Sequence, residues 1–198
     1  MRNYLLAGWL LLPIGAWAYH EGPGQDRVAL EEVDAALVTA HASAAAGAWQ
    51  AAITEYEAAL AALPKDAEDT CPGVRQRLQV ELNKARLEGH ELPIARDELG
   101  ALVLELDGDT QADPQVRRDA RQALAQAQFY TTWLMRLEGL DRSAWEPEIE
   151  AARQNWRLLA EQATTTDEVA HHQRDLEAAV RLSRLEIEDL QGLPLPSQ

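Results

Sequence analysis

Histidine is the residue type in this chain best suited to bind a metal ion, and it occurs at His20, His41, His90, His171 and His172. A metal site on one helix needs ligands three or four positions apart, so that they share a face. His171 and His172 are adjacent and point about 100° apart on a helix, so we do not expect them to hold one ion together. Glu168 and Asp175 stand at the required spacing from a histidine and keep a weak metal site open. The dipeptide His20-Glu21 is a second weak alternative.

The other reactive side chains give no support for catalysis. Acids such as Glu31-Glu32, or Glu186 and Asp189, fall on faces that we expect to be solvated, whereas catalytic acids lie in a cleft that shifts their pKa values. Cys71 precedes Pro72 in a predicted loop. Its side chain is either an inert thiol, a reactive thiol or part of an intermolecular disulfide. The chain has no phosphate-binding loop, dinucleotide fingerprint or nucleophile elbow. We therefore expect no enzyme, no catalytic residue, no cofactor and no resident metal.

The charge of the chain restricts its partners. Eighteen basic and 33 acidic residues give a net charge of -15. Nucleic acid is not expected as a partner, because its phosphates would be repelled. The acids either form solvated helix faces that keep the protein soluble or steer a basic partner toward it.

The first 18 residues have the features of a secretory signal peptide. Arg2 precedes an apolar run from Tyr4 to Trp17, and Ala16-Trp17-Ala18 has the small-x-small pattern of a cleavage site. The run is shorter than the roughly 20 residues that span a bilayer. The alternative is an uncleaved membrane anchor facing outside the cytoplasm. We expect export to the periplasm or cell envelope, with residues 19–25 as a polar linker.

The rest of the chain is predicted to be all-α. Ala and Leu, which favour helices, far outnumber the β-branched Ile and Val, and no segment alternates apolar and polar residues as a strand would. Expected helix starts include a cap at Asp113 and two capping boxes, Ser143 to Glu146 and Thr165 to Glu168. The seven expected helices cover 26–46, 48–63, 74–88, 92–106, 114–138, 143–163 and 166–191.

One segment carries a specific pattern. It consists of Gly47, Trp49, Ala52, Ile53, Tyr56, Ala59, Leu60 and Pro64. This spacing resembles the second half of a tetratricopeptide repeat (TPR), in which glycine permits a tight turn, small residues bring two helices close, and proline ends the unit. The resemblance implies an α-solenoid of antiparallel hairpins over residues 26–108 with a groove that binds another protein. A weaker second unit echoes it at Gly89, Ala101 and Leu102.

The C-terminal half loses this period. Residues 109–191 are expected to form about three longer helices that cap the solenoid, followed by a Pro-containing tail at 192–198. Large aromatic residues gather here: Phe129, Tyr130, Trp133, Trp145 and Trp156. They either fill the core between two helices or form an anchor pocket for a partner.

These patterns predict an exported, TPR-like scaffold that binds a protein partner and touches membrane only if its N-terminal segment stays uncleaved. Two alternatives are a membrane-anchored structural subunit of an envelope complex and a helical bundle that binds a metal or small ligand.

Overall fold

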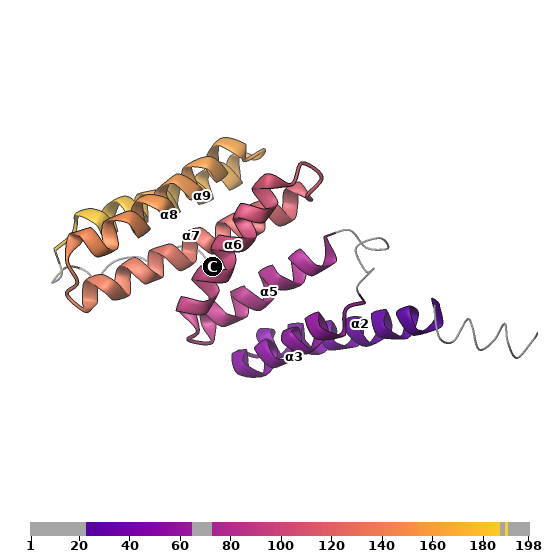
Figure 1. Ribbon diagram of the computed structural model, residues 1–198. Helices are drawn as coiled ribbons and strands as arrows, with labels where there is room; N and C mark the ends of the chain where they lie inside the picture. The colour runs from indigo at the N-terminus through magenta and orange to yellow at the C-terminus, as the bar shows by residue number, and fades with distance from the viewer. Residues whose placement is uncertain (1–22, 65–72, 187–188, 190–198) are drawn as a thin grey trace, which may run out of the picture. The chain divides into compact units, whose positions relative to one another are not determined.

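The computed structural model describes residues 23–64, 73–186 and 189, and within these ranges the chain is helical without strands (Figure 1). The helices are α2 (Pro23–Ala45), α3 (Trp49–Ala62), α5 (Val74–Glu88), α6 (Leu92–Gly108), α7 (Pro114–Leu137), α8 (Arg142–Gln162) and α9 (Thr166–Arg184). The all-α prediction is confirmed. The expected signal peptide, His20, Cys71 and the tail lie outside the described residues. None of the helices in these ranges has the length and apolar character needed to cross a bilayer.

The chain divides into two compact units between Leu78 and Gln79, inside the segment predicted to hold the hairpins. In the first unit, α2 packs along α3 (Figure 1). Gly47 joins them with a φ of +73°, and the N–H of Ala48 donates to the carbonyl of Ser43 at 2.9 Å. This is the glycine-terminated end that a tight helix–helix turn needs.

The residues of the repeat pattern divide into a buried set and a flanking set. Ala52, Ile53, Tyr56 and Ala59 are buried. Trp49, Leu60 and Pro64 are half-buried. Small residues at two of the buried positions leave room for the facing helix, where Ala40 is also buried. The rings of Tyr56 and His41 are nearly perpendicular, with centroids 5.8 Å apart.

In the second unit, α6 packs on α7, α7 on α8, and α8 on α9. One apolar cluster includes Val80 of α5, Leu99 and Leu102 of α6, and Val116 and Leu124 of α7. A second cluster joins α7, α8 and α9 through Phe129, Trp145, Ile149, Trp156, Leu159 and Leu182. Within this unit, each helix from α6 to α9 therefore packs on the next.

Arginines link these helices through polar contacts that no local pattern indicates. Arg121 of α7 donates to Asp107 of α6 at 2.7 Å and to Asn155 of α8 at 3.0 Å. Arg96 of α6 donates to Glu148 of α8 at 3.1 Å. This carboxylate raises the pKa of Arg96. Charge-assisted hydrogen bonds are stronger than neutral ones, so these pairs help to fix the positions of α6, α7 and α8 along one another.

Most helix boundaries agree with the sequence, and the exceptions have local causes. Asp113 caps α7 by accepting from the N–H of Gln115 at 2.8 Å, as expected. Thr165 and Glu168 form the expected capping box of α9. The other predicted box is wrong: α8 starts after Asp141, so Ser143 lies inside it and Glu146 instead accepts from Arg142 at 2.9 Å.

Two further helix ends differ from the prediction. The first helix is predicted to begin at residue 26, but α2 already begins at Pro23. Proline suits the first turn because its missing N–H has no partner there in any case. The last helix was expected to continue to residue 191 but ends at Arg184, with the N–H of Leu185 still donating to the carbonyl of Arg181.

One burial pattern recurs 43 residues apart. Buried Ala52, Tyr56, Ala59 and Leu63 correspond to buried Ala95, Leu99, Leu102 and Leu106. A residue with positive φ precedes each set: Gly47 at +73° and His90 at +68°. The residue that corresponds to Gly47 in the second copy of the pattern is therefore His90 and not the predicted Gly89. Ala101, the predicted counterpart of Ala59, is exposed.

Candidate functional site: an apolar pocket lined by α5, α6 and α7

The five aromatic residues singled out in the sequence occupy two different environments. Phe129, Trp145 and Trp156 are buried in the cluster formed by α7, α8 and α9. Tyr130 and Trp133 pack against that cluster and also line a surface pocket. The structure therefore places three of these rings in the core and leaves two at a position where a ligand has access.

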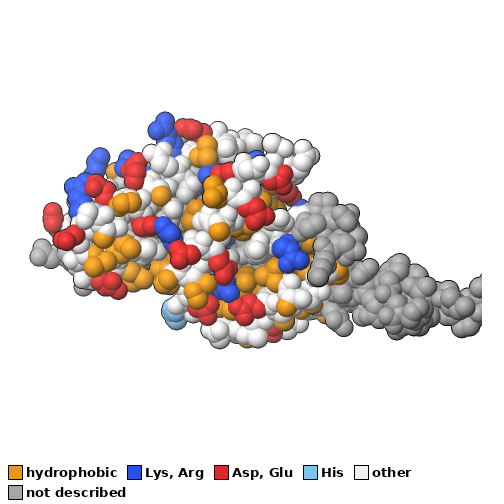
Figure 2. Space-filling model, in the orientation of Figure 1, with side chains coloured by type: hydrophobic (Ala, Val, Ile, Leu, Met, Phe, Trp, Pro, Cys, Tyr) orange, Lys and Arg blue, Asp and Glu red, His pale blue; other side chains and the backbone are white. Residues whose placement is uncertain are grey.

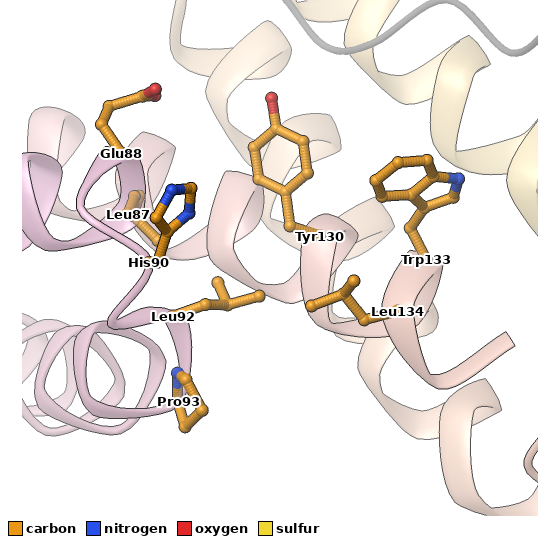
Figure 3. Close-up of a pocket in the computed structure, with 8 residues that line it drawn as sticks. All are labelled: Leu87, Glu88, His90, Leu92, Pro93, Tyr130, Trp133 and Leu134. Atoms are coloured by element: carbon orange, nitrogen blue, oxygen red, sulfur yellow. The ribbon is translucent and has the colours of Figure 1, made fainter. Parts of the chain in front are cut away.

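The pocket has a volume of about 370 Å³. Its walls are Leu87 and Glu88 at the end of α5, His90 in the turn, Leu92 and Pro93 at the start of α6, and Tyr130, Trp133 and Leu134 on α7. Figure 3 shows Leu92 and Leu134 pointing toward one another across the gap, with the Tyr130 ring standing beside them. Its size is at the lower end of the range for small-ligand and anchor pockets.

The turn between α5 and α6 sets one side of the pocket. His90 adopts the left-handed conformation, and the N–H of Glu91 donates to the carbonyl of Arg86 at 2.9 Å, closing α5. Histidine tolerates this conformation better than most non-glycine residues. Leu92 and Pro93 then begin α6 directly, so the first turn of this helix faces α7.

The rim of the pocket continues into exposed apolar surface. Leu134 and Leu137 in the last turn of α7, and Leu140 shortly after it, are 43–45% exposed. Figure 2 shows apolar side chains exposed among acidic and basic groups, including over the end of α7. Neighbouring exposed leucines beside a cavity are typical of interaction surfaces and unlike scattered single residues.

One polar group of the pocket wall has no partner. The indole N–H of Trp133 is buried and makes no hydrogen bond with the described residues. Figure 3 shows its nitrogen on the edge of the ring turned away from Leu92 and Leu134. The donor of Trp133 is therefore not turned toward a ligand in the pocket.

Sequence reasoning identified Tyr130 and Trp133 but missed the aliphatic wall. Leu87, Leu92 and Leu134 resemble ordinary helix residues, and nothing in their spacing indicates that they meet. The turn at His90 brings the first two together, and the packing of α6 on α7 adds the third.

A second group of reactive side chains lies on α9. Ligand atoms of His171, His172 and Asp175 lie within 4.8 Å of one another. Burial, followed by the charge of His171, lowers the pKa of His172, while Asp175 and Glu168 oppose the shift. Glu168 itself takes part in the capping box, where the N–H groups of Thr164 and Thr165 lower the pKa of its carboxyl group.

No protein-family model, curated protein or solved structure matches this chain.

Proposed function

We propose that this chain is an exported scaffold of the cell envelope that binds a partner protein through the pocket lined by Tyr130 and Trp133. The occupant is a partner segment with a bulky apolar side chain next to Lys or Arg residues. The helices form a TPR-like array in which this pocket is the anchor site.

The observation that carries the proposal is the pocket together with its leucine rim. Leu92, Leu134 and the ring of Tyr130 offer an apolar hollow that would desolvate one large side chain. Leu137 and Leu140 extend the apolar surface beyond it. An apolar hollow with exposed leucines following it in the chain is suited to the desolvated centre of a protein interface.

Charge favours a basic partner. Glu88 lines the pocket, and the whole chain carries a net charge of -15. A cationic segment would be steered toward such a surface, whereas an acidic one would be repelled.

The TPR-like arrangement is supported by two features. Gly47 and the buried residues of α3 follow the family's spacing, and the helices from α6 to α9 each pack on the next. Repeat arrays of this kind expose extended binding surfaces. Export is supported by the signal-like residues 1–18.

The test is selection of displayed random peptides on the full chain, followed by affinity measurement of the enriched peptides. We expect the peptides to combine an aromatic or leucine residue with flanking Lys or Arg. Leu134→Glu should weaken their binding by about tenfold or more, because it places a charge on the pocket wall.

Leu104→Glu is the matched control. Leu104 is an exposed leucine of α6 in the same unit, 77% exposed, and it does not line the pocket. The same change of charge there should leave affinity within about twofold. No enrichment, or equal loss in both variants, contradicts the proposal. Mass spectrometry of the protein from its own cells tests export separately, with a mature start at Tyr19 as the expected result.

A further inference from the structure

We infer that His171, His172 and Asp175 on α9 form a binding site for a divalent transition-metal ion such as Zn²⁺. This inference is independent of the partner-binding proposal, since the three residues lie outside the pocket lined by Tyr130 and Trp133.

The ligand atoms are already close together. One atom from each of the three residues lies within 4.8 Å of the others, and His171 Nε2 is 3.6 Å from Asp175 Oδ2. In a tetrahedral zinc site with bonds of about 2.0–2.2 Å, ligand atoms lie roughly 3.3–3.6 Å apart. Small side-chain rotations therefore suffice to bring the three residues onto one ion.

The two adjacent histidines converge although their Cα–Cβ bonds point in different directions. Their rings meet edge to face with centroids 5.3 Å apart. Asp175 is four residues after one histidine and three after the other, so it stands on the next turn of the same helix, facing both. The carboxylate of Asp175 supplies a third ligand beside the two imidazoles.

Burial supplies an independent reason for a ligand. His172 is 8% exposed, and its Nδ1 is buried without a hydrogen-bond partner among the described residues. Asp175 is 2% exposed. Buried polar nitrogens are normally satisfied by a hydrogen bond or a ligand, so the unsatisfied Nδ1 of His172 indicates that a ligand binds here. A cation bound here would use both groups.

A second cavity gives an ion access to these residues. It measures about 390 Å³ and is lined by both histidines and Asp167 of α9, together with residues of α7 and α8, including Asp119. His171 is half-buried at its wall. Two imidazoles and one carboxylate suit Zn²⁺, with water or a further ligand from the cavity at the remaining position.

The experiment is titration of the full chain with Zn²⁺ against a chromophoric chelator, with Co²⁺ as a spectroscopic probe. We expect one ion to bind and Co²⁺ to give the visible absorption of a low-symmetry site. His171→Gln and Asp175→Asn should each weaken binding by about tenfold or more and remove the Co²⁺ spectrum. Unchanged circular dichroism would show that both variants fold; His171 is partly exposed, so its replacement leaves the core intact.

Two control variants locate the ion. His41→Gln changes an exposed histidine of α2 and should leave the affinity unchanged. His20→Gln should do the same; if it removes binding instead, the ion sits at the N-terminal segment and the inference is wrong. Absence of binding at micromolar Zn²⁺, or full binding by both His171→Gln and Asp175→Asn, also overturns it.

Discussion

Tyr56 and Trp49 are both aromatic residues of α3, but they differ in burial and so in what their loss should cost. Tyr56 is 1% exposed, whereas Trp49 is half-buried. Tyr56→Ala should lower the free energy of unfolding by about 3–5 kcal/mol, because it leaves a cavity against α2. Trp49→Ala should cost less. Urea denaturation followed by circular dichroism measures both.

Tyr56→Phe keeps the ring and serves as the control for this prediction. It removes only the hydroxyl group, so the free energy of unfolding should fall by about 1 kcal/mol. If Tyr56→Ala were as mild as Tyr56→Phe, the ring would not be filling the space between α2 and α3, and the proposed repeat would be contradicted.

Single residues also show where sequence reasoning reaches its limit. Gly47 was identified as a turn residue because glycine readily adopts positive φ, and it has φ +73°. For the turn between α5 and α6 the sequence predicts Gly89 as the turn residue, but His90 takes the left-handed conformation. Residue type alone does not decide between adjacent positions, since the register of Leu92 and Leu99 against α7 fixes which residue must turn.

At the scale of helices, one of the two predicted capping boxes forms and the other does not, and this difference can be tested. Thr165 accepts a hydrogen bond from the N–H of Glu168 at 3.2 Å, whereas Ser143 lies inside α8 and caps nothing. Thr165→Ala should lower the free energy of unfolding by about 1 kcal/mol, and Ser143→Ala should leave it nearly unchanged. Thermal unfolding compares them directly; an equal loss in both would place the start of α8 at Ser143 after all.

The far end of α9 depends on a residue of another helix. Arg136 of α7 donates to the carbonyls of Leu182 and Leu185, and burial lowers the pKa of Arg136. Arg136→Met should lower the free energy of unfolding by about 2–4 kcal/mol, because it leaves these carbonyls without their cation and removes the contact with the Trp145 ring.

Arg136→Lys is the informative comparison at this site. Lysine keeps the charge but lacks the planar guanidinium group that donates to two carbonyls at once. The rate of amide hydrogen exchange at the end of α9 should therefore rise in both variants, and more in Arg136→Met. Unchanged exchange in both would show that the carbonyls are satisfied without Arg136.

Helices were predictable from sequence to the extent that their signals are local. Pro114 with Asp113, and Thr165 with Glu168, define helix starts by hydrogen bonds within a few residues. The pocket and the arginine links were not predictable in this way. Arg96 and Glu148 are 52 positions apart, and their meeting depends on how α6, α7 and α8 stack.

At the scale of the whole molecule, the net charge of -15 predicts how a basic partner should associate. The screening length falls from about 30 Å at 0.01 M salt to about 8 Å at 0.15 M, so the association rate with a peptide selected on the pocket should fall by roughly tenfold over this range. The dissociation rate should change little with salt but rise in Leu134→Glu, because the apolar pocket and not the distant charges holds the bound segment. Stopped-flow fluorescence separates the two rates. An association rate independent of salt would mean that the acidic residues serve only to solvate the helices.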